Sequence, residues 1–149
     1  MTTAREQHAR CLCGAVRITV RNRPAGYGIC HCRMCQRWSG ALLAAVNCPP
    51  GTVTIEGADH IAAFQSSDWA ERAWCTTCGS HLWYRVTKDG PHAGDYEITV
   101  GLFDDPDGFV LEREIFVDRK SDAFEIAGDH PRMTEAEVLA LYGASSSGA

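Results

Sequence analysis

The chain has 149 residues, of which 45% are hydrophobic and 22% are charged, values typical of a single globular domain. No apolar run approaches the roughly 18 residues of a membrane span, and 14 basic against 19 acidic residues give a net charge of −5. We therefore expect neither a membrane protein nor a nucleic-acid-binding protein.

The predicted elements are mostly short strands. We expect a flexible start over residues 1–9, a single zinc-binding β domain over 10–142 and a disordered tail over 143–149. Alternating or apolar runs between turn residues predict strands at 15–21, 41–47, 53–56, 61–65, 71–74, 81–86, 96–102 and 114–118. The acidic stretch 104–108 is typical of a hairpin turn.

Two helical segments are expected. Residues 33–38 follow an extended stretch at 29–32 and are predicted to form one helical turn. Near the end, Thr134 and Glu137 form a capping box, which predicts a short C-terminal helix over 135–141. The sequence thus predicts a mainly β fold.

The N-terminus lacks the apolar core of a signal peptide, so we expect a cytoplasmic protein. In a reducing compartment, eight cysteines indicate metal ligands or reactive thiols rather than a disulfide framework.

Two cysteine pairs stand far apart in the chain. Cys11 and Cys13 precede Gly14, and Cys75 and Cys78 precede Gly79. Glycine adopts the positive φ that a tight turn around a metal requires. The pairs together supply four thiolates, the set that closes a structural zinc site. A dithiol redox pair is the alternative for Cys75 and Cys78, but a strand-like segment follows them where a redox motif opens a helix.

Three further cysteines, Cys30, Cys32 and Cys35, lie within six residues. Their spacing is too short for ordinary disulfides and suits a soft metal such as zinc. Three ligands leave a tetrahedral shell one short, which is typical of a catalytic zinc site. The fourth position could also be filled by a protein side chain; the candidates are Cys48, His31, His60 and His81. Of these, His31 should point away from its neighbours, and Cys48 should be a small buried hydrophobe.

Basic residues flank the three-cysteine motif. Arg33 and Arg37 could bind carboxylates of an anionic ligand through bidentate hydrogen bonds, whereas Arg72 and Arg85 would then be ordinary surface charges. His8, His92 and His130 lie in loop-like sequence and are expected to be solvated.

The three motifs resemble those of the glutathione-dependent formaldehyde-activating enzyme family, which also includes centromere protein V. The resemblance spans about residues 10–120 and rests on CLCG at 11–14, CHCRMCQRWSG at 30–40 and CTTCG at 75–79. It implies a zinc-bound β-tent fold with two zinc ions. By the resemblance, Cys11, Cys13, Cys75 and Cys78 match the structural ligands, and Cys30, Cys32 and Cys35 match the catalytic ones.

The resemblance also implies an activity. The expected enzyme is a zinc-dependent carbon–sulfur lyase that forms or cleaves a thiol–aldehyde adduct such as S-(hydroxymethyl)glutathione, with a small thiol such as glutathione as its partner. A non-catalytic zinc-stabilised binding module is the alternative.

Overall fold

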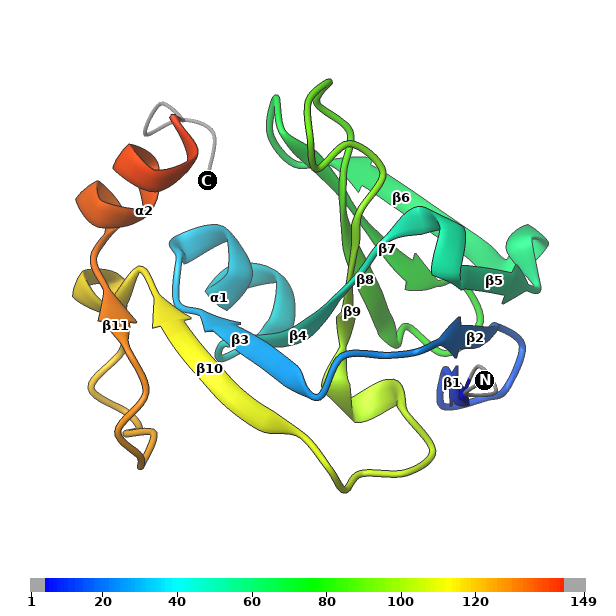
Figure 1. Ribbon diagram of the computed structural model, residues 1–149. Helices are drawn as coiled ribbons and strands as arrows, with labels where there is room; N and C mark the ends of the chain where they lie inside the picture. Colours follow the sequence, from blue (N-terminus) through cyan, green and yellow to red (C-terminus); the bar gives the residue numbers. More distant parts are fainter. Residues whose placement is uncertain (1–4, 144–149) are drawn as a thin grey trace.

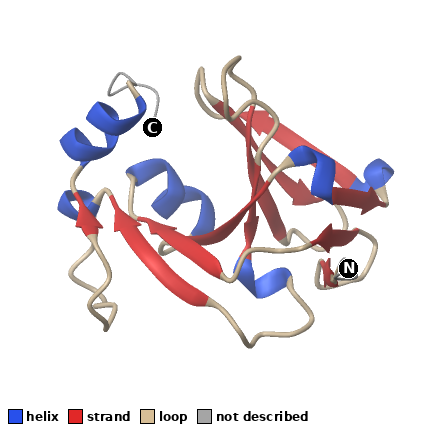
Figure 2. Ribbon diagram, in the orientation of Figure 1, coloured by secondary structure: helices blue, strands red, loops and turns tan. Residues whose placement is uncertain are grey.

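The structure is a computed structural model that describes residues 5–143. Its strands are β1 (Glu6–Arg10), β2 (Arg17–Arg21), β3 (Gly26–Cys30), β4 (Leu43–Cys48), β5 (Val53–Glu56), β6 (Ile61–Gln65), β7 (Ala70–Cys75), β8 (His81–Val86), β9 (Tyr96–Thr99), β10 (Val110–Ile115) and β11 (Arg132–Met133). The α-helices are α1 (Arg33–Ser39) and α2 (Glu135–Tyr142). Four 3-10 helices are η1 (Pro50–Thr52), η2 (Ala58–His60), η3 (Val100–Leu102) and η4 (Val117–Arg119). The predicted mainly β fold with a short C-terminal helix is confirmed (Figure 2).

The strands form two sheets. A three-stranded sheet has the order β1-β2-β5, and an eight-stranded sheet has the order β11-β10-β3-β4-β9-β8-β7-β6. Strand β10 is parallel to both of its neighbours, β3 and β11, whereas the other paired strands are antiparallel. In Figure 1 the larger sheet runs from β11, beside α2, to β6 near the small sheet. The parallel pairing brings residues 110–115 beside the start of the three-cysteine motif.

The alternating pattern of the sequence explains the strands well. In β2, Ile18 and Val20 are buried while Arg17 and Arg21 are exposed, so one face of the strand packs on the core. Strands β5, β6 and β8 coincide with the predicted ranges, and β4, β7 and β9 end within three residues of theirs.

The capping residues define both helices. The Cys32 thiol accepts a hydrogen bond from the first turn of α1, and Gly40 ends that helix with a φ of 89°. Thr134 and Glu137 form the predicted capping box of α2, and Gly143 ends it with a φ of 65°.

The folded region begins before residue 10, the predicted start of the β domain. Glu6–Arg10 form β1, which pairs with β2 along its whole length and buries Ala9. Because β2 offers a free edge to this segment, residues 6–9 belong to the folded region. Residues 1–4 lie outside the described residues, as do residues 144–149 of the disordered tail predicted over 143–149, whereas Gly143 ends α2.

Two further expectations for the second half of the chain are wrong. The acidic stretch 104–108 forms no hairpin, because β9 and β10 are not paired and the chain instead crosses to β3. The last predicted strand begins four residues earlier than expected, at Val110, and ends at Ile115, where η4 follows.

The buried side chains form two clusters. The first lies around the small sheet and includes Val16, Ile18, Val46, Leu82 and Ile98. The second surrounds the three-cysteine motif and contains Cys32, Cys35, Leu43, Ala45, Phe116 and Val138. Val138 comes from α2, so the C-terminal helix helps to enclose this motif. Within residues 5–143, no helix has the length and hydropathy needed to cross a membrane.

Candidate functional site

The first candidate metal site joins the two cysteine pairs. The Sγ atoms of Cys11, Cys13, Cys75 and Cys78 all lie within 4.8 Å of one another. One pair comes from the loop between β1 and β2, and the other from the turn between β7 and β8. The structure therefore brings together the four residues that the spacing predicted, across more than 60 positions of sequence.

Both turns have the predicted conformation. Gly14 has a φ of 81° and its N–H donates to the Cys11 carbonyl at 3.1 Å; Gly79 has a φ of 77° and its N–H donates to the Cys75 carbonyl at 2.8 Å. The backbone also supports the thiols, since the N–H of Val16 donates to the Sγ of Cys11 at 3.3 Å. Such N–H donors favour the thiolate form that binds a metal.

Ser80 links the two turns. Its Oγ accepts a hydrogen bond from the N–H of Leu12 at 2.9 Å and lies 3.2 Å from the Sγ of Cys78. Hydrogen bonding by the Ser80 hydroxyl lowers the pKa of Cys78 to about 5. No pattern in the sequence indicated a role for this serine.

The second candidate site is the three-cysteine motif. Cys30 ends β3, Cys32 is the N-cap of α1 and Cys35 lies within that helix. Their Sγ atoms lie within 4.8 Å of one another, and the N–H of Cys35 donates to the Sγ of Cys32 at 3.3 Å. The strand-to-helix turn therefore points all three sulfurs to one place.

The electrostatics of this cluster favour a thiolate. Hydrogen bonding from the Cys30 thiol, then from Cys35, holds the pKa of Cys32 far below its ordinary value, and the positive charge of Arg72 acts in the same direction. Hydrogen bonding to Cys32 raises the pKa of Cys30. A buried set of thiols that shares negative charge in this way is suited to binding a cation such as zinc.

No fourth protein ligand joins the three cysteines among residues 5–143. Cys48 is fully buried in the other cluster, with its Sγ near the Val46 carbonyl. His81 stacks on Trp38 with ring centroids 4.5 Å apart, and His60 lies 3.3 Å from the Thr77 hydroxyl. The three-cysteine motif therefore offers three candidate metal ligands, one fewer than the four-cysteine set.

His31 points away from the sulfurs, as predicted. It is fully buried, and its Nε2 lies 2.7 Å from Glu114 Oε1 on β10. His130 Nε2 lies 2.5 Å from the other oxygen of Glu114, and Arg132 Nε lies 3.1 Å from it. His130 is therefore buried and paired, and the expectation that it is solvated is wrong. Although burial opposes ionisation, the hydrogen bonds from His130 and His31 lower the pKa of Glu114.

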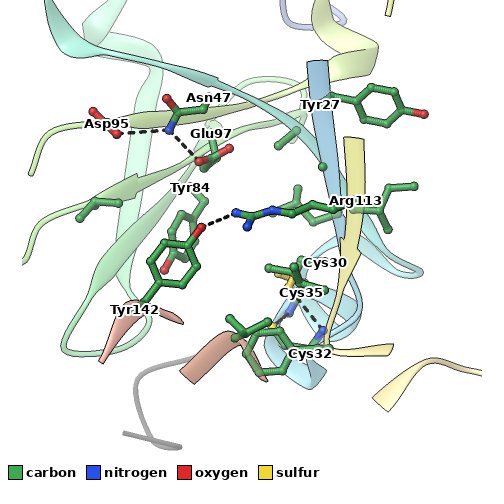
Figure 3. Close-up of a pocket in the computed structure, with 18 of the residues that line it drawn as sticks. Tyr27, Cys30, Cys32, Cys35, Asn47, Tyr84, Asp95, Glu97, Arg113 and Tyr142 are labelled. Carbon is green, nitrogen blue, oxygen red and sulfur yellow. Dashed lines mark hydrogen bonds between the residues drawn. The ribbon is translucent and has the colours of Figure 1, made fainter. Parts of the chain in front are cut away.

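The three cysteines line a cavity of about 380 Å³. Figure 3 shows Cys30, Cys32 and Cys35 at one end and Asn47, Asp95 and Glu97 at the other. Asn47 Nδ2 donates to Asp95 at 3.2 Å and to Glu97 at 2.9 Å.

Helix α2 closes one side of this cavity. Arg113 of β10 donates to the hydroxyl of Tyr142 at the end of α2, and both residues lie between the two ends of the cavity (Figure 3). The cavity thus has a sulfur-rich end, a carboxylate-rich end and a wall that the C-terminal helix supplies.

The arginines that line this cavity differ from the two, Arg33 and Arg37, that were predicted to bind an anionic ligand. Arg33 and Arg37 are exposed and do not line it, whereas Arg72 and Arg113 do. Arg72 lies on β7, is only 3% exposed and donates to the Sγ of Cys35 at 3.5 Å. In the sequence Arg72 directly follows Glu71, and two adjacent charged residues look like surface positions, so sequence reasoning missed it.

Comparisons with known proteins agree with this arrangement. The family model described as "Glutathione-dependent formaldehyde-activating enzyme" matches residues 6–119. A Schizosaccharomyces pombe protein named an uncharacterized lyase is 25% identical over 134 residues, which is 90% of this chain and 95% of that protein.

Two other fungal proteins share the name "Putative glutathione-dependent formaldehyde-activating enzyme". The Podospora anserina protein is 34% identical over 57% of this chain, and the Penicillium rubens protein is 29% identical over 64% of it. The alignments cover 42% and 52% of those two proteins. Because the family model spans both cysteine sites and most of the chain, this protein belongs to the glutathione-dependent formaldehyde-activating enzyme family.

Proposed function

We propose that this chain is a zinc-dependent carbon–sulfur lyase that acts on a thiol–aldehyde adduct such as S-(hydroxymethyl)glutathione. One observation carries the proposal: the two thiol clusters differ in their number of cysteines and in whether they line the cavity. The four-cysteine set is complete, whereas the three-cysteine set opens on the cavity. This difference separates a structural metal site from a catalytic one.

The donor chemistry fits two zinc ions. Seven thiols in two tight groups, each supported by N–H donors, match the preference of zinc for thiolates. We assign a structural role to Cys11, Cys13, Cys75 and Cys78 and a catalytic role to Cys30, Cys32 and Cys35. A zinc ion held by Cys30, Cys32 and Cys35 would supply Lewis acidity, which favours the ionised form of a thiol.

The residues of the cavity would bind and orient the substrate. A cavity of about 380 Å³ lies within the range of small-molecule sites. Its polar residues Asp95, Glu97 and Arg113 can pair with the amino and carboxylate groups of a thiol of the size of glutathione. The names of the related fungal proteins support this choice of substrate. All eight cysteines are free thiols, which suits the reducing cytoplasm.

Exchange NMR of glutathione and formaldehyde tests the activity directly. We expect the zinc-loaded protein to accelerate formation and cleavage of the adduct above the spontaneous rate. The protein should also carry about two zinc ions, and Cys48→Ala should keep both, because Cys48 belongs to neither thiol group. No acceleration at any pH, with both zinc ions bound, would favour the non-catalytic binding module instead.

A further inference from the structure

Arg72 is a buried cation with unused hydrogen-bond donors. The side chain is 3% exposed, its Nε donates to the Ser66 hydroxyl at 3.1 Å and its NH1 donates to the Sγ of Cys35 at 3.5 Å. Its NH2 is buried and has no hydrogen-bond partner. A buried charged group with unpaired donors is costly, so its retention beside the thiols calls for an explanation.

Two aromatic rings hold this guanidinium in place. Its central carbon lies 5.3 Å from the ring centroid of Trp38 and 5.1 Å from that of Tyr84. Within the described chain, no Asp or Glu forms an ion pair with Arg72. The cation is therefore fixed in the cavity wall with its charge balanced only by the neighbouring sulfurs.

The proposed reaction requires a donor at this place. When a thiolate adds to an aldehyde, a sulfur electron pair forms the C–S bond and the C=O π pair moves to the oxygen. That oxygen then takes up the proton that the thiol released. In the reverse direction the hydroxyl loses its proton, the C=O bond re-forms, the C–S pair returns to sulfur and the departing thiolate takes up the proton. The oxygen carries negative charge in both directions and needs a fixed hydrogen-bond donor.

We propose that Arg72 is that donor: its guanidinium binds the aldehyde-derived oxygen of the adduct while the sulfur occupies the three-cysteine site. The inference rests on the proposed function and adds a catalytic residue to it. It favours an adduct with an oxygen on the carbon next to sulfur, because the guanidinium already lies 3.5 Å from a sulfur of the thiol cluster.

Variants of Arg72 test the role. Arg72→Met keeps the apolar stem between the two rings but removes every donor, and Arg72→Lys keeps one charged donor group. Arg85→Met is the matched control, because Arg85 lies 5.1 Å from the ring centroid of Tyr96 in the same kind of contact but does not line the cavity. Adduct cleavage, zinc affinity by chelator competition and the dissociation constant of glutathione alone are measured for each.

We expect Arg72→Met to lower kcat about 10²- to 10³-fold, the usual loss for one oxyanion donor. Arg72→Lys should lose less and Arg85→Met should retain the wild-type kcat, while zinc and glutathione affinities stay close to wild type in all three. A wild-type kcat in Arg72→Met would overturn the inference. So would a loss of rate explained by weaker zinc or glutathione binding, because Arg72 would then hold the metal or the thiol. If Arg72→Met fails to fold, Arg72→Lys decides by the same measurements. An inactive wild-type protein would instead overturn the proposed function, before any variant is compared.

Discussion

His31 Nε2 lies 2.7 Å from Glu114 Oε1, and this contact joins the three-cysteine motif to a strand 83 positions later in the chain. His31 lies between Cys30 and Cys32 in the chain, so its contact with Glu114 anchors the segment while the three cysteines line the cavity. His130 and Arg132 contact the same carboxylate, so Glu114 is a buried carboxyl group with three side-chain partners.

Replacing Glu114 should destabilise the fold strongly. Glu114→Ala leaves the buried side chains of His31 and His130 without their hydrogen-bond partner, and each buried polar group left unsatisfied costs about 1–3 kcal/mol. Urea unfolding of the zinc-loaded protein measures the loss. Glu125→Ala is the control, because Glu125 is exposed and its pair with Lys120 should contribute at most about 1 kcal/mol. Equal losses in the two variants would show that the buried cluster contributes little.

The two thiol clusters should respond differently to loss of one ligand. Cys75→Ser removes a sulfur from the site that joins the small sheet to β7, and a structural zinc site contributes about 10 kcal/mol or more to folding. This variant should be unfolded by circular dichroism. Cys32→Ser should stay folded, retain one zinc ion and lose the adduct-cleaving activity. If both variants lose stability equally, the division between structural and catalytic sites is wrong.

Gly57 should not tolerate a side chain. It has a φ of 87°, and a Cβ there would lie 1.9 Å from the backbone carbonyl oxygen of Ala15. Gly57→Ala should therefore cost about 3 kcal/mol or more, because backbone would have to move. Gly108 has a φ of 83° but nothing within 4 Å of a Cβ, so Gly108→Ala should cost only about 1 kcal/mol. Thermal unfolding of both variants at equal zinc content checks the difference.

Glu97 should make stability depend on pH. Burial raises the pKa of its carboxyl, and the charge of Asp95 acts in the same direction. Because the folded-state pKa lies above the unfolded value, the contribution of Glu97 is fully present below the unfolded pKa and is lost as pH rises through the folded pKa. Glu97→Gln, which keeps an acceptor for Asn47, should therefore gain stability over wild type as pH rises.

Urea unfolding from about pH 4, near the unfolded pKa of a glutamate, to about pH 8 measures this difference, with the exposed Glu56→Gln as control. A stability difference between Glu97→Gln and wild type that does not change with pH would contradict the assignment. Glu97 lies at the carboxylate-rich end of the cavity, so Glu97→Gln leaves the cysteines of both thiol clusters unchanged.

The sequence by itself determined the local features of this protein. The alternation of β2, the capping box of α2 and the positive φ of Gly14 and Gly79 all depend on residues close in the chain. The composition of the two cysteine groups could also be predicted, because short spacings between thiols restrict the ways in which they can share a metal.

Only the tertiary structure decided what surrounds the reactive thiols. Arg72, Glu114 and His130 look like ordinary polar residues in sequence, yet all three are buried beside or behind the three-cysteine motif. Their burial follows from the parallel pairing of β10 with β3 and from the place of β7 in the same sheet, which no local pattern specifies. Thiol spacing thus predicts which cysteines group together, whereas the fold decides which charged side chains lie beside them. A buried charge is stable only beside partners, and long-range strand pairing supplies these partners.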